Sequence, residues 1–69
     1  MDFGDVIKGI KNKKVARRKG WNGKNMHLYL KSFPNHDPFI CMFTAQGTHQ
    51  PGWLASQADM LAEDWEFIE

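Results

Sequence analysis

The sequence predicts a small α+β domain: an antiparallel sheet of about four strands, an N-terminal helix and a short second helix, with copies assembling as a homo-oligomer. Apolar residues near the start recur with the period of a helix, and later apolar runs are short and bounded by glycine, proline or asparagine. A chain of 69 residues is one domain, 1–69, and hides only about 60% of the surface of its unfolded form. Association would bury more.

The first element is an amphipathic helix. Its apolar positions follow the i, i+3, i+4, i+7 spacing: Phe3, Val6, Ile7 and Ile10. Asp2 and Asp5 lie at its positively polarised start and lysines in its last turn, as the helix dipole favours. Asn12 and Lys13 are expected to end it, so that the helix covers one face of the sheet.

A basic strand from Val15 to Gly20 then enters the turn 21–24, which contains Asn-Gly. Asn and Gly tolerate the positive φ of a two-residue hairpin loop. Gly20 and Gly23 also flank Trp21, which would leave the indole free to stack on a bound partner. Both interpretations, hairpin turn and stacking site, are open at this point.

The second strand covers 26–31, where Met26, Leu28 and Leu30 alternate with polar or amphipathic residues. Tyr29 is either an ordinary surface aromatic or a second ring near the site. Residues 33–38 form a loop because their two prolines, Asn and Asp stop strand pairing.

A third strand, 39–45, is apolar on both faces, as expected of a strand in the sheet interior or of one buried by a neighbouring subunit. Turns follow at 46–47 and 51–52. Ser56 with Asp59 matches a capping box and predicts a helix from Ser56 to about residue 62. Residues 65–68 form a last short strand, and the core is the favoured place for Trp53 and Trp65.

Cys41 is the single cysteine, so an internal disulfide is excluded and a reducing compartment is the simpler interpretation. His27, His36 and His49 lack the spacing of metal ligands, so we expect no metal. We also expect no cofactor. No apolar run exceeds five residues, which predicts neither a membrane span nor a signal peptide. The expected location is the cytoplasm.

The net charge of +1 hides a strong segregation of charge. Basic residues crowd the first third of the chain, and acidic ones crowd the end: Asp59, Glu63, Asp64, Glu66 and Glu69. This pattern indicates an anion-facing surface, charge pairing between the two ends, or a solvated basic face.

Catalysis needs a nucleophile, a base and a stabilising group within reach of one another, and the candidates here are isolated in the sequence. We therefore predict that the protein is not an enzyme. Basic residues beside an aromatic fit a single-stranded nucleic-acid binder, although a near-even charge balance argues against one. They fit equally well a site for a small nucleotide-derived anion. Inhibition of a host protein through an aromatic surface is a further alternative.

Two blocks of sequence, 14–26 (KVARRKGWNGKNM) and 53–65 (WLASQADMLAEDW), joined by a Leu-Tyr-Leu strand, resemble a phage family. Its characterised members are the second type of Thoeris anti-defence (Tad) sponges. The resemblance implies a compact α+β protein that forms dimers and tetramers and binds cyclic nucleotide immune signals without cleaving them. These signals are chiefly glycocyclic ADP-ribose isomers (gcADPR) and, in some members, cyclic oligonucleotides. Longer members carry an extra segment where this chain has only 31–38.

The resemblance also implies roles for individual residues. Trp21 would stack on a base, and Asn22, Gly23 and Lys24 would meet ribose or phosphate. Arg17 and Arg18 alternate along a strand, so we expect only one to face the ligand. The remaining residues of the expected site are Tyr29 and, for contacts to sugar hydroxyls, Ser56, Gln57 and Asp59. Ser56 and Asp59 are explained equally well as helix caps.

Overall fold

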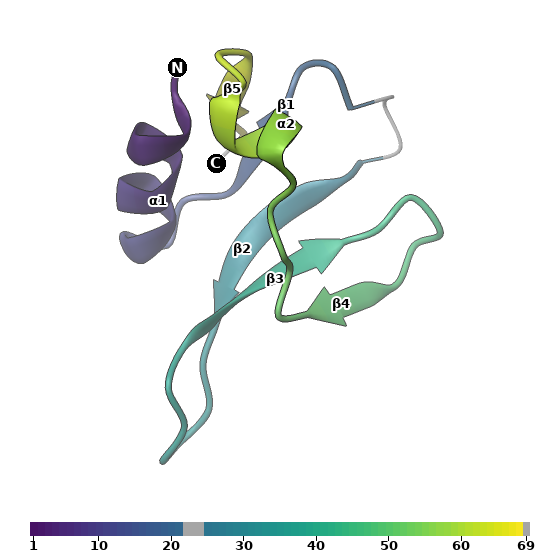
Figure 1. Ribbon diagram of the computed structural model, residues 1–69. Coiled ribbons are helices and arrows are strands. Elements are labelled where there is room, and N and C mark those ends of the chain that lie inside the picture. Colours follow the sequence, from purple (N-terminus) through teal and green to yellow (C-terminus); the bar gives the residue numbers. More distant parts are fainter. Residues whose placement is uncertain (22–24, 69) are drawn as a thin grey trace.

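The computed structural model describes residues 1–21 and 25–68, and within these ranges it has the expected α+β architecture (Figure 1). The strands form one antiparallel sheet in the order β4-β3-β2-β1-β5. Its elements are α1 (Phe3–Lys11), β1 (Ala16–Arg18), β2 (His27–Lys31), β3 (Phe39–Phe43), β4 (His49–Pro51), α2 (Gln57–Leu61) and β5 (Trp65–Phe67).

Both helices begin where the sequence predicts. The Asp2 carboxylate caps α1 by accepting a hydrogen bond from the amide of Asp5, at 2.9 Å. The Ser56 hydroxyl caps α2 in the same way, accepting from the amide of Asp59 at 3.1 Å. Each cap satisfies an amide that the first helical turn leaves without an internal partner.

Four of the five strands correspond to the four expected from the sequence, and β4 is an addition. It falls in the stretch 46–52, which was predicted to contain only turns. All three of its residues are exposed, so they carry no hydrophobic alternation. Pro51 is compatible with the strand because β4 lies at the edge of the sheet. Gly47 and Gly52, with φ of 82° and 72°, make the turns on either side.

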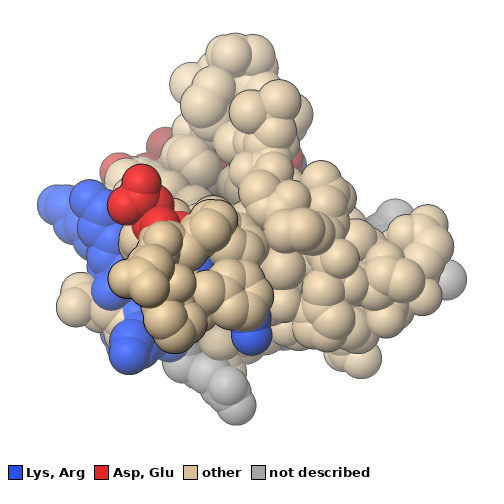
Figure 2. Space-filling model, turned by 90° about the horizontal axis from the view of Figure 1, so that it is seen from below, with Lys and Arg blue, Asp and Glu red and all other residues tan. Residues whose placement is uncertain are grey.

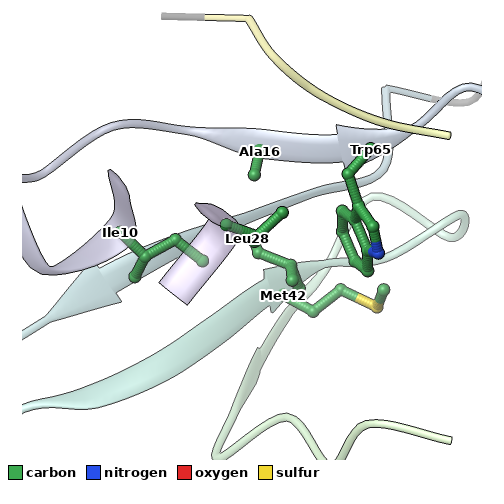
Figure 3. Close-up of a cluster of buried hydrophobic side chains, with 6 residues drawn as sticks. Ile10, Ala16, Leu28, Met42 and Trp65 are labelled. Atoms are coloured by element: carbon green, nitrogen blue, oxygen red, sulfur yellow. The ribbon is translucent and has the colours of Figure 1, made fainter. Parts of the chain in front are cut away.

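The core lies between one face of the sheet and α1 (Figure 3). The strand registers pair Ala16 with Leu28 and Leu28 with Met42, so these three side chains point to the same side. Val6 and Ile10 of α1 pack on them, as does Trp65 of β5, which is only 2% exposed. The placement of Trp65 in the core is thereby confirmed, and Trp53 packs against the same cluster.

β5 joins the sheet beside β1, so the acidic end of the chain lies next to its basic strand. Charge pairing between the two ends, one of the alternatives drawn from the sequence, therefore occurs within one molecule. Figure 2 shows most of the Lys and Arg atoms of that view on the side where α1 lies, while much of the rest of the view carries neither charge. No described helix combines the length and apolar character needed to cross a bilayer.

Candidate functional site

Trp21 follows the end of β1, where it joins an aromatic cluster with Phe3, Trp53 and Trp65. Its ring lies edge-on to Trp65, with centroids 5.2 Å apart, and edge-on to Trp53 at 6.3 Å. The amide of Trp21 donates to the carbonyl of Arg18 at 3.1 Å, which turns the chain out of the strand. The indole is therefore less free than the stacking interpretation supposed, because core neighbours hold the ring, and it remains partly exposed.

A recess of about 210 Å³ lies beside this ring. Its walls combine an indole, a thioether, an amide, basic side chains and one carboxylate, contributed by Arg17, Arg18, Lys19, Trp21, Asn25, Met26 and Glu66. Part of the wall is thus apolar and flat, whereas most of its polar groups are hydrogen-bond donors. Such a recess suits a ligand that pairs a planar ring with oxygen acceptors.

The two arginines of β1 are held by carboxylates from the other end of the chain. Arg17 Nε lies 2.8 Å from Glu66 Oε2. Arg18 bridges two acids: its Nε lies 2.8 Å from Asp64 Oδ1 and its Nη1 2.9 Å from Asp59 Oδ1. These contacts fix both guanidinium groups against the sheet and cancel part of their charge.

Asp64 positions the chain that leads to Trp21. Its second carboxylate oxygen accepts from the amide of Gly20 at 2.9 Å, and its carbonyl accepts from the amide of Lys19 at 2.9 Å. A Cβ at position 20 would lie 3.0 Å from that carboxylate, so a glycine suits this close approach. Asp64 thus ties residues 18–20 to β5 and sets the position from which the indole projects.

The electrostatics agree with this geometry. The hydrogen bond from Arg18 holds the pKa of Asp64 below its ordinary value, and it outweighs the effect of desolvation. Burial alone would raise the pKa of Asp59, but hydrogen bonds from Arg18 and Ser56 lower it overall. The same partners, Asp64 before Asp59, raise the pKa of Arg18. All three groups are therefore charged at neutral pH.

The structure brings together three residues of the expected site. Trp21, Arg17 and Arg18 line the same recess. Both arginines reach the recess because it lies at the end of β1; that only one of them faces the ligand stays a prediction. Asn22, Gly23 and Lys24, which were expected to meet ribose or phosphate, lie outside the described residues.

Tyr29 does not line this recess, so the structure does not bring it together with Trp21. It lines a different hollow, with Phe39, Cys41 and His49 among its neighbours. Its hydroxyl lies 2.5 Å from His49 Nδ1. Interaction with Cys41 and burial raise the pKa of Tyr29 to about 12, so the phenol is neutral at physiological pH. The misplacement follows from register, since Tyr29 points to the face opposite Leu28.

Among the α2 residues, Asp59 reaches the site only indirectly, through its ion pair with Arg18. Ser56 serves as the helix cap. Gln57 begins α2 and is exposed. None of the three lines the recess.

Several residues of the recess were not among the site residues expected from the sequence: Lys19, Asn25, Met26 and Glu66. The acidic crowding at the chain end was the available signal for Glu66 and for Asp64. Asn25 has a positive φ of 59°, which asparagine adopts more easily than most residues and which shapes the return into β2.

In the described part of the chain, no group of three or more His, Cys, Asp or Glu side chains is arranged to hold a metal ion. What the recess offers is stacking or edge contact from an indole and charge-assisted hydrogen bonds from guanidinium and ammonium groups. Those are the elements of non-covalent recognition of an anionic, ring-containing ligand.

Comparison with known families and proteins gives a consistent result. Residues 1–68 match the family model described as Tad2-like, the Thoeris anti-defense 2-like domain. The chain is also similar to Thoeris anti-defense 2 of Bacillus phage SP01, with 33% identity over 84 aligned positions that cover 99% of this chain and 94% of that protein. Because the alignment is longer than the present chain, the relative contains residues with no counterpart here.

Proposed function

The chain belongs to the Thoeris anti-defense 2-like family, and from this premise we propose that it is a phage protein that sequesters a nucleotide-derived immune signal in the cytoplasm of the infected host. The signal is a cyclic ADP-ribose isomer or a cyclic oligonucleotide. The protein holds the signal without cleaving it, so that the effector that the signal would activate stays off.

The observation that carries this proposal is the recess beside Trp21. It combines an aromatic wall with cationic donors from Arg17, Arg18 and Lys19. A nucleotide presents the complementary groups, a flat base and anionic phosphate oxygens. Ligand sites for drug-sized molecules usually measure about 300–1,000 Å³, so a recess of about 210 Å³ would hold one part of such a signal, such as a base with its neighbouring phosphate.

The same chemistry supports the proposal that the ligand is not turned over. The polar groups of the recess are mainly permanent cations and an amide, which bind anions but do not move protons at neutral pH. Its carboxylate, Glu66, is engaged by Arg17 at 2.8 Å. The proposed mechanism is therefore mass action, which demands nanomolar affinity, about −12 kcal/mol.

Titration calorimetry tests the proposal directly. The purified protein is titrated with gcADPR, with cyclic di- and trinucleotides, and with a short single-stranded oligonucleotide. We expect nanomolar binding of at least one cyclic compound and no comparable binding of the oligonucleotide. Recovery of the ligand intact by mass spectrometry tests whether it is cleaved.

Two variants test whether the ligand binds in the recess. Trp21→Ala removes the aromatic wall, and Lys19→Ala removes a cation from an exposed residue whose change should leave the fold intact. Both should weaken binding at least about tenfold, roughly 1.4 kcal/mol. Lys11→Ala on α1 is the matched charge control and should bind normally. Unchanged affinity in both Trp21→Ala and Lys19→Ala would exclude this recess as the site.

A further inference from the structure

The end of α1 carries a group of basic side chains that the recess does not use. All four are exposed, and we call them the lysine cluster: Lys8, Lys11, Lys13 and Lys14. In the described part of the chain, every ion pair is made by Arg17 or Arg18, so none of them engages the cluster. The cluster lies on the side of the molecule where Figure 2 shows most of the basic atoms of that view.

The backbone closes α1 without help from these lysine side chains. The amides of Asn12 and Lys14 both donate to the carbonyl of Gly9 at 2.9 Å, and the amide of Lys13 donates to the carbonyl of Ile10 at 2.9 Å. The side-chain amide of Asn12 donates to the carbonyl one residue before Gly9, at 3.1 Å. This is the Schellman pattern of helix ends. The last carbonyls therefore have partners already, and the ammonium groups are left to face outwards.

Lys13 has a backbone conformation that does not suit a lysine. Its φ is 66°, in the left-handed region. The Schellman pattern requires this region at the first residue beyond the cap, where glycine is usual because a Cβ is strained. The helix dipole is a sufficient reason for Lys8 and Lys11 in the last turn, but it does not offset strain at position 13. Strain of this kind indicates a role for the side chain that is present.

The chemistry of the cluster selects a partner with dense, repeated negative charge. A lysine ammonium is a point charge on a flexible stem and lacks the fixed fork with which arginine grips a single carboxylate. Lys8 and Lys11, three residues apart, lie on one side of the helix with their Cβ atoms about 5–6 Å apart. A nucleic-acid duplex carries one negative charge for about every 1.7 Å of its axis. Neighbouring lysines of the cluster can therefore meet phosphates in succession.

Two other polyanionic partners fit less well. Unpaired bases need an accessible ring to stack on, but Phe67 packs directly on Gly9, and Lys14 Nζ lies over its ring, 5.4 Å from the centroid. A membrane surface takes up the apolar face of a helix, but Val6 and Ile10 of α1 are 0% and 1% exposed and belong to the core. Contact through charge alone favours the backbone of a duplex.

We propose that the lysine cluster binds the phosphate backbone of double-stranded nucleic acid without reading its sequence. This function goes beyond sequestering a signal. No residue of the cluster lines the recess beside Trp21, so the inference stands whether or not the proposed signal binds there. The near-even charge of the whole chain does not oppose it, because the acidic residues 59, 64 and 66 are paired with the arginines of β1.

Fluorescence anisotropy with labelled DNA duplexes of two unrelated sequences measures this binding. We expect dissociation constants of micromolar order at low salt, equal for the two sequences. A cluster that neutralises four phosphates gives a slope of about −3.6 for log K against log salt, so affinity should fall about 150-fold between 50 and 200 mM NaCl.

Lys13→Gly is the decisive variant because it should change stability and binding in opposite directions. Relief of the strained φ should raise the urea midpoint of unfolding. Loss of one phosphate contact should weaken duplex binding and reduce the affinity lost between the two salt concentrations to about 40-fold. Lys13→Arg keeps the charge and should bind as the unmodified chain does.

Lys31→Gln is the matched charge control. Lys31 is exposed and alternates along β2 with the core residue Leu28, so it points to the face of the sheet opposite α1. This variant should bind the duplex normally. Unchanged duplex binding or a lower urea midpoint in Lys13→Gly, or an equal loss of binding in Lys31→Gln, would overturn the inference. So would co-sedimentation with phosphatidylserine vesicles without binding to the duplex, which would assign the cluster to membranes.

Discussion

Replacement of Trp65 by phenylalanine tests the role of this indole as the link between core and site. Trp65 is 2% exposed and contacts Phe3 and Trp21, with ring centroids 5.5 and 5.2 Å away. Its Nε1 donates to the carbonyl of Asp59 at 3.0 Å. That carbonyl belongs to α2, a helix of five residues whose last carbonyls need partners from outside the helix.

The expected loss of unfolding free energy in Trp65→Phe follows from these contacts. Losing the hydrogen bond costs about 1 kcal/mol. The smaller ring leaves unfilled space, at a cost below the 3–5 kcal/mol of a full truncation to alanine, or about 1–2 kcal/mol. The expected loss is therefore about 2–3 kcal/mol, a large part of the roughly 3–10 kcal/mol that a domain of this length has.

The assay is urea unfolding at one fixed protein concentration, followed by far-UV circular dichroism because the substitution itself alters tryptophan fluorescence. We expect a lower midpoint with an unchanged slope. Trp53→Phe is the matched control. Trp53 is only half-buried, and its ring centroids lie farther from their neighbours, at 6.3 and 6.4 Å. Trp53→Phe should therefore lower the unfolding free energy by only about 1 kcal/mol. Equal losses in both variants would refute the assignment of Trp65 as the link.

Two further predictions concern the ion pairs and the turns. Because the pKa of Asp64 is lowered in the folded state, the unfolded chain takes up this proton first on acidification. The stabilisation by Asp64 is thus full above about pH 5 and is lost as pH falls through the folded pKa. Urea titrations should show that Asp64→Asn is less stable than the unmodified chain at pH 7. Between pH 7 and pH 3 the variant should lose less unfolding free energy than the unmodified chain does. Gly52 has φ of 72° with open space around it, so Gly52→Ala should cost about 1 kcal/mol of unfolding free energy from backbone strain alone. Gly52→Asn should recover part of that loss, and equal stabilities of the alanine variant and the unmodified chain would contradict the assigned turn.

Local signals in the sequence predicted most of the fold. The spacing of Val6 and Ile10, the Ser56 cap and the alternation around Leu28 each depend on a few neighbouring residues, and each is confirmed. β4 was not predicted because its exposed residues owe their conformation to pairing with β3, not to their own pattern.

The site was less predictable because it depends on pairing between distant segments. Arg17 and Glu66 are 49 residues apart in the chain, and Arg18 and Asp64 are 46 apart. Only the registration of β5 against β1 brings them together. Without knowledge of that register, the sequence allows Tyr29 and Trp21 to be assigned to one site, although in the sheet Tyr29 points to the face opposite the core.

The ion pairs also bear on how the recess would attract its ligand. A protein that tracks nucleic acid uses unpaired cations, and its affinity falls steeply with added salt as counterions are released. Here Arg17 and Arg18 are already paired with Glu66, Asp64 and Asp59. Their carboxylates orient the guanidinium donors while reducing the net field at the recess. Recognition by such a site depends more on donor geometry and contact with the indole than on long-range attraction, which favours a compact ligand over an extended polyanion.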